Sequence, residues 1–292
     1  MEFIISASTD IGVKRKNNED SLYVCRLGTN CGNMVFAVMC DGMGGLSHGA
    51  CASATVVDAF VKWMRITLPV LLRRDIPDHM IKEQWLSIID AQNSRLRAYG
   101  SESGALLGTT AATMLLTEKH YYILNIGDSR IYEITDGVRQ ITTDHSLVAR
   151  EVALGNLTTQ QATLAPQQNV LTQCVGGSED AAEPDVYFGE PRAGAVYMLC
   201  SDGLRHMVSP EEIYNFFRPS AMTGAAEMRG QEGALIACNI ARGETDNISV
   251  VTIRTPGGDT GGRAPEGGGE VALPGGFVIA EEICYTQGQP LI

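Results

Sequence analysis

Three apolar segments of this chain each run into an aspartate at a glycine-containing turn. Asp41 follows MVFAVMC, Asp128 follows HYYILNIG and Asp202 follows AVYMLCS. Each segment has the length and composition of a strand buried on both faces, so the fold must bring carboxylates to the ends of core strands. Burying several carboxylates is unfavourable unless a positive group lies among them. The pattern therefore predicts a sheet-rich fold whose strand ends surround a cluster of divalent cations.

Three further acidic residues, at two sites, lie directly before apolar strands. Glu19 and Asp20 precede SLYVC, and Asp246 precedes NISVVTI. Taken singly, each aspartate of the set is typical of a turn or a helix cap. Together they form an oxygen-only ligand set without a His/Cys cluster, which favours Mg²⁺ or Mn²⁺ over zinc. The glycines of GMGG after Asp41 would let the backbone approach a bound ligand.

Such a cluster suits phosphate-ester hydrolysis. Two ions about 3.5–4 Å apart can hold a bridging water, convert it to hydroxide near neutral pH and offset the charge of a phosphoryl group under in-line attack. Arg15, five residues before Asp20, offers a guanidinium fork that matches phosphate oxygens. A solvated surface arginine beside Lys14 and Lys16 is an equally good interpretation.

Composition excludes several other classes. The net charge is -12, from 22 basic and 34 acidic residues, which argues against nucleic acid or an anionic membrane as partner. We find no apolar run of about 18 residues or more, and MEFIISASTD lacks the basic and long apolar regions of a signal peptide. The eight cysteines form no CxxC pair, so we expect a reduced, cytoplasmic protein.

The order of expected elements is strands, two helices, strands, two helices, strand. Most links between strands are short, so the sheets should be largely antiparallel with helices packed outside. The prediction is an α+β fold, a four-layer α/β/β/α sandwich of two mainly antiparallel sheets flanked by helix pairs. Strands are expected at 3–9, 21–25, 34–40, within 109–142 (a meander), at 185–189, 195–200 and 247–254, and helices at 48–66, 81–96, 209–217 and 225–241.

The composition changes after Thr255. We expect a domain over 1–255, a Gly/Pro-rich linker over 256–276 and a short apolar C-terminal tail over 277–292. The tail segment FVIAEEICY either adds as a strand to a sheet edge or is disordered, and the linker composition favours disorder. In that case deletion of 257–292 would leave turnover of a small aryl phosphate intact.

Eight segments, in order over roughly residues 5–254, resemble the type-2C (PPM) metal-dependent protein serine/threonine phosphatases, most of all the bacterial branch. They are GVKRKNNED, CDGMGG, LGTTAATMLL, IGDSRIY, TTDHSLV, QNVLTQCVG, CSDGL and TDNISVV. The resemblance implies the same α/β/β/α sandwich. It also implies that 145–170 is a mobile flap that shapes access for protein substrates.

The resemblance implies a role for each acidic position. Asp41 would bridge two metal ions, with the Gly42 carbonyl as an additional ligand, and Asp202 and Asp246 would complete the second ion's carboxylates. Asp128 would share a third, weaker ion with Asp202. Asp20, with Glu19 beside it, would orient metal-bound water, and Arg15 would bind the phosphate.

The chain departs from the family pattern at three positions. Met43 replaces the histidine of eukaryotic members, and Ala50 replaces a glutamate usual in bacterial ones, so a local support contact is missing. His206 stands where a small polar or acidic residue is usual and either touches the metal shell or is a solvated turn residue. His145, in the DHS motif, either contacts substrate phosphate or makes a structural hydrogen bond.

The predicted function is hydrolysis of phosphoserine and phosphothreonine on proteins by a hydroxide bridging two Mg²⁺ or Mn²⁺ ions, in opposition to a bacterial Ser/Thr kinase. The expected partners are phosphorylated proteins and that kinase, with no nucleic acid or membrane, and the chain is expected to be a monomer. Two alternatives stay open: a phosphoprotein-binding regulatory module with weak turnover, and a phosphohydrolase for small molecules.

Overall fold

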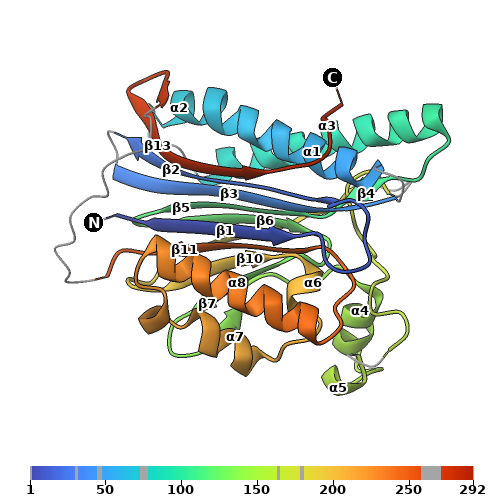
Figure 1. Cartoon of the computed structure of the whole chain (residues 1–292). Helices are drawn as coiled ribbons and strands as arrows, with labels where there is room; N and C mark the ends of the chain where they lie inside the picture. The colour runs from blue at the N-terminus through green and yellow to red at the C-terminus, as the bar shows by residue number, and fades with distance from the viewer. Residues whose placement is uncertain are drawn as a thin grey trace.

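Two antiparallel sheets face each other, and helices cover both outer faces (Figure 1). The computed structural model describes residues 2–29, 32–44, 48–72, 78–162, 165–177, 181–257 and 271–291. All pairings between its named strands are antiparallel. The predicted four-layer α/β/β/α sandwich is confirmed.

Within the part of the chain that the structure describes, the larger sheet has eight strands and the smaller has five. The order in the larger is β12 (Val271–Leu273), β13 (Phe277–Tyr285), β2 (Asp20–Thr29), β3 (Gly32–Met43), β5 (Ala111–Thr117), β6 (Tyr121–Ile126) and β9 (Asp185–Gly189), with β4 (Gly108–Thr109) on the end of β3. The order in the smaller is β1 (Ile4–Asp10), β11 (Ile248–Arg254), β10 (Val196–Cys200), β7 (Arg130–Ile134) and β8 (Val138–Gln140).

A helix pair packs on each sheet. On the larger sheet lie α1 (His48–Lys62) and α3 (Asp78–Ser103), joined through a π-helical turn, Trp63–Thr67, and α2 (Leu68–Leu71). On the smaller lie α7 (Pro210–Phe217) and α8 (Ala225–Ala241), with a 3₁₀ turn at Pro219–Ala221 between them. Three short helices belong to loops: α4 (Leu147–Ala153), α5 (Thr159–Ala162) and α6 (Asp202–Arg205).

The buried apolar side chains form three layers, one between the two sheets and one between each sheet and its helices. Both faces of the central strands are therefore covered, which explains why apolar residues follow one another along these strands instead of alternating with polar ones. In β2, Tyr23 and Cys25 face the α1/α3 layer, whereas Leu22 and Val24 face the other sheet. Strands covered on both faces need apolar side chains at every position. The layer between the larger sheet and the helices α1 and α3 is the most aromatic. In this layer the Trp85 ring packs edge-on against Trp63 at a centroid distance of 5.5 Å.

Differences from the sequence prediction lie at element ends and in the last segment. The second helix begins at Asp78 and continues to Ser103, beyond the apolar stripe that predicted it. Of the two alternatives for 277–285, the structure has the strand: β13 pairs along β2. β12 falls within the predicted linker, while 258–270 lies outside the described residues, so the domain boundaries stay predictions.

No helix among the described residues is long and apolar enough to cross a membrane.

Candidate metal and phosphate site

The site begins with two carboxylates on neighbouring strands. Asp20 opens β2 and lies directly opposite Asp41, near the end of β3, in the antiparallel register. Side chains at opposed positions share one face with Cβ atoms about 5 Å apart. The two carboxylates therefore face each other at the edge of the sandwich.

Loops from both sheets bring the other three aspartates to this edge. Asp202 is the first residue of α6, directly after β10, Asp246 precedes β11, and Asp128 follows β6. All three, with Asp20, act electrostatically on Asp41. The fold thus brings together every aspartate that the sequence singled out.

The cluster is short of positive charge. Burial, and then repulsion by Asp20 and the other three aspartates, raises the pKa of Asp41 well above its usual range. Burial raises the pKa of Asp20 to about 7, against hydrogen bonds from Ser249 and Ser201 that lower it. Burial and Asp202 raise the pKa of Asp128 to about 6. Carboxyls in such an environment favour a bound cation.

The unpaired oxygens support this conclusion. Asp20 Oδ2 accepts a hydrogen bond from Ser201 Oγ at 2.9 Å, but the buried Oδ1 atoms of Asp20 and Asp202 have no partner within the described structure. Free, buried carboxylate oxygens are what a hard divalent cation binds. Among the described residues, no group of three His, Cys, Asp or Glu side chains stands in metal-binding geometry.

Gly42 adds a backbone constraint beside Asp41. A Cβ atom there would lie 2.1 Å from the Gly49 carbonyl oxygen and 2.7 Å from that of Glu19. The Gly42 N–H donates to the Glu19 carbonyl at 3.1 Å. Only glycine permits this close approach of three backbone segments, which fixes Asp41 relative to Asp20.

Arg15 lies at the rim of the cluster rather than in free solvent. Its Nη2 atom is 2.6 Å from Asp246 Oδ2 and Nη1 is 3.7 Å from Glu19 Oε2, while 45% of the side chain is exposed. The loop that carries Arg15 is held by Asn247, whose Oδ1 accepts from Glu19 N at 2.9 Å and whose Nδ2 donates to the Asn17 carbonyl at 3.1 Å. A half-exposed guanidinium beside buried carboxylates is suited to bind a phosphate that enters from solvent.

Arg205, which the sequence analysis did not single out, occupies the Asp128 side of the site. Its Nη2 donates to Asp128 Oδ2 at 3.0 Å and to the Asp128 carbonyl at 3.1 Å, and lies 3.7 Å from Asp144 Oδ2. Asp144 in turn accepts two hydrogen bonds from Arg130, at 2.8 and 2.7 Å. The only signal in the sequence was an arginine directly after the DGL turn, which by itself is typical of a surface position.

Both histidines of the sequence analysis have carboxylate partners. His206 is not a solvated turn residue: Nε2 lies 3.4 Å from Asp202 Oδ2 and Nδ1 lies 3.3 Å from Glu244 Oε2. Burial alone would lower the pKa of His206, but Glu244 and Asp202 more than offset it and raise that pKa. His145 uses both ring nitrogens, since Nδ1 accepts from Gly127 N at 3.4 Å and Nε2 lies 3.2 Å from Asp185 Oδ2. The structural alternative for His145 is therefore present.

Comparison with known proteins agrees with this geometry. The family model described as Protein phosphatase 2C matches residues 13–235. A putative protein phosphatase 2C-type of Streptococcus pyogenes is 32% identical over 258 residues, which cover 87% of this chain and 98% of that protein. This chain belongs to the protein phosphatase 2C family.

Solved structures resemble it over the same extent. The serine/threonine phosphatase of S. agalactiae superposes with a TM-score of 0.74 at 28% identity, covering 87% of this chain and 99% of that one. The catalytic domain of the serine threonine protein phosphatase PstP, in complex with two manganese ions, gives a TM-score of 0.67 at 29% identity, covering 87% of this chain and 98% of that one.

Proposed function

We propose that this chain is a metal-dependent phosphatase that hydrolyses phosphoserine and phosphothreonine on proteins. The observation that carries the proposal is the convergence of five aspartates, with unpaired buried oxygens, beside a half-exposed arginine. Membership of the protein phosphatase 2C family supports it, as do relatives that are named serine/threonine phosphatases.

The residues fit two divalent cations, Mg²⁺ or Mn²⁺. When bound, such ions lower the pKa of a water and offset the charge of the phosphoryl group. The proposed ligand set is Asp20, Asp41, the Gly42 carbonyl, Asp202 and Asp246. The relative crystallised with two manganese ions supports this number.

The chain's own side chains would orient the reaction. Asp20 keeps Oδ2 on Ser201, so its one unpaired oxygen, Oδ1, would contact the ions through the attacking water, from which it would accept a hydrogen bond. Arg15 shares Asp246 with the proposed ligand set, so ligation of Asp246 would release the guanidinium to bind two phosphate oxygens.

A third ion at Asp128 fits less well. The Arg205 guanidinium already bonds the Asp128 carboxylate and carbonyl, and it is a permanent cation. We therefore propose two bound ions, with Arg205 in place of a third ion as the cation that neutralises the Asp128 carboxylate. His145 contact with substrate phosphate and access control by 145–170 stay predictions.

The proposal extends to partners and location. Phosphorylated proteins would be the substrates and a Ser/Thr kinase the opposing enzyme, and we propose a monomer in the cytoplasm. The seven cysteines among the described residues are free, which fits a reducing compartment.

Substrate class is the decisive test. We would compare phosphothreonine, phosphoserine and phosphotyrosine peptides with phosphorylated metabolites, each with Mn²⁺, Mg²⁺ or EDTA. Metal-dependent turnover that favours the phosphothreonine and phosphoserine peptides is expected. Faster turnover of metabolites would favour the small-molecule alternative, and tight peptide binding without turnover would favour the binding module.

A further inference from the structure

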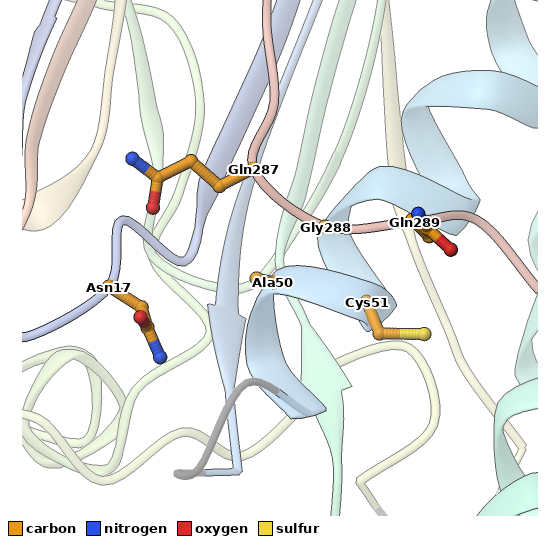
Figure 2. Close-up of a pocket in the computed structure, with 6 residues that line it drawn as sticks. All are labelled: Asn17, Ala50, Cys51, Gln287, Gly288 and Gln289. Carbon is orange, nitrogen blue, oxygen red and sulfur yellow. The ribbon is translucent and has the colours of Figure 1, made fainter.

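The segment after β13 crosses the catalytic end of the fold. β13 pairs with the outer edge of β2 from Val278 opposite Gly28 to Tyr285 opposite Leu22, and so ends beside the strand end that carries Asp20. Residues 286–291, which we call the strap, then run over the start of α1. Figure 2 shows Gln287 and Gly288 of the strap beside Ala50 on that helix.

The strap is hydrogen-bonded to the segment that precedes Asp20. Gln287 Oε1 accepts from the backbone N–H of Asn18 at 2.9 Å. Asn18, which is buried, uses its own Oδ1 to accept from Asp20 N at 3.1 Å. Gln287 therefore fixes the backbone of Asn18, and the side chain of Asn18 in turn fixes the backbone of Asp20.

A second path runs through hydroxyl groups. Thr286 Oγ1 lies 3.1 Å from Ser21 Oγ, which lies 2.9 Å from Ser53 Oγ. Ser53 Oγ donates to the Glu19 carbonyl at 2.6 Å. The strap thus contacts residues on both sides of Asp20, Asn18 through its backbone N–H and Ser21 through its side-chain hydroxyl.

Close packing fixes the strap in this position. A Cβ atom on Gly288 would lie 1.9 Å from the Ala50 carbonyl oxygen and 2.8 Å from Cys51 N, so the two backbones touch where a side chain would not fit. Farther along, Leu291 N donates to Thr55 Oγ1 at 3.0 Å. A pocket of about 340 Å³ is left between Asn17, the start of α1 and the strap.

The strap also coincides with a departure from the family pattern. Ala50, where the resemblance expects a glutamate, is buried directly under Gly288. The family match ends at residue 235, and relatives covered almost completely leave about an eighth of this chain unmatched. The strap therefore packs on the residue at which this chain departs from the family pattern.

We propose that the strap is a positioning element of the catalytic site, in which the Gln287 side chain fixes the Asn18–Asp20 backbone for metal binding. This inference rests on the proposed function, because it concerns the same ligand set. It also differs from the sequence-based expectation that the segment is dispensable, because turnover of a small aryl phosphate at limiting Mn²⁺ should depend on the strap.

The test compares full-length wild type with Gln287→Ala, Gln287→Glu and Gln289→Ala. Gln289 is the matched control, since it lies in the strap with no side-chain hydrogen bond among the described residues. Calorimetric titration would measure Mn²⁺ affinity, and hydrolysis of an aryl phosphate would give the Mn²⁺ activation constant and kcat. Loss of an outer-shell contact typically weakens metal affinity by about tenfold or more.

We expect Gln287→Ala to weaken Mn²⁺ binding about tenfold, with kcat at saturating Mn²⁺ retained, and Gln287→Glu, which keeps the acceptor, to restore the affinity. Hydrogen exchange should speed up at Asn18 in Gln287→Ala while β2 stays protected. Mn²⁺ affinity within twofold of wild type in Gln287→Ala would overturn the role of the strap and leave the phosphatase proposal standing. A wild type that neither binds Mn²⁺ nor hydrolyses phosphate esters would overturn both.

Discussion

Replacing Asp41 with asparagine should stabilise the metal-free protein while it abolishes metal-dependent turnover. The carboxyl at position 41 faces four other aspartates, and its pKa is raised well above the usual range by burial and by these neighbours. Asparagine has nearly the same shape without the charge. The variant should therefore remove repulsion that the wild type relieves only by holding a proton or binding a cation.

The size of the stabilisation can be worked out from the strand register, which sets the distance between the carboxylates of Asp20 and Asp41. Asp20 and Asp41 are directly opposed, and two unit charges about 5 Å apart at an effective dielectric constant of about 20 repel each other by about 3 kcal/mol. In a domain of this size 1 kcal/mol shifts the melting temperature by about 2–4 °C, so a gain of about 6 °C or more is expected at pH 8.

The stability that Asp41→Asn gains over the wild type should increase with pH. Because the pKa of Asp20 in the folded protein is about 7 and that of Asp41 is also raised, the native state binds more protons than the unfolded chain above pH 4. Wild-type stability should then fall as the pH rises through 7, and the advantage of the variant should grow from almost nothing at pH 4 to its full value at pH 8.

Thermal unfolding in EDTA between pH 4 and pH 8 measures this directly. Asp136→Asn, in the exposed β7–β8 turn, is the matched control and should leave the melting temperature nearly unchanged. Addition of Mn²⁺ should stabilise the wild type more than Asp41→Asn. A metal-free Asp41→Asn variant that melts several degrees below wild type at pH 8 would refute the reasoning.

Three further substitutions test the surroundings. Arg205→Ala should cost about 3 kcal/mol, because it leaves the buried Asp128 without its cation, and should raise the number of Mn²⁺ ions bound; unchanged stability and stoichiometry in unfolding and titration experiments would contradict the role of Arg205. Glu232→Ala should cost about 3 kcal/mol in urea unfolding, because Ser6, Ser8 and Thr252 lose a common acceptor in the core, whereas a loss below 1 kcal/mol would show that these hydroxyls find other partners. Gly42→Ala should reduce Mn²⁺-dependent turnover by about 100-fold, because its Cβ would displace the Gly49 carbonyl; normal kinetics would show that the Gly42 contact is dispensable.

Much of the fold could be predicted because its signals are local. Apolar runs without alternation, as in MVFAVMC, indicated strands covered on both faces, and helical periodicity indicated α1 and α3. Aspartates at strand ends predicted the carboxylate cluster, because a sandwich brings strand ends to one edge. Asp20 and Asp41, which are opposed in the register, confirm that logic.

The remaining features depend on contacts between distant segments. Nothing local in GLRHMV shows that Arg205 reaches Asp128, 77 positions earlier in the chain. Composition around the Gly/Pro-rich segment favoured disorder for 277–285, but pairing with β2 and burial of Phe277 and Ile279 offset the cost of ordering the strand. Long-range pairing of this kind is set by the whole sheet and not by the segment.

The central claim is that the aspartate cluster binds the divalent cations that make this chain a protein phosphatase. The most direct test is hydrolysis of a phosphothreonine peptide by wild type, Asp41→Asn, Asp202→Asn and Asp136→Asn, with Mn²⁺ and with EDTA. Turnover that requires Mn²⁺, persists in Asp136→Asn and is lost in the other two variants is the predicted result. Turnover that survives EDTA, or that survives both Asp41→Asn and Asp202→Asn, would contradict the claim.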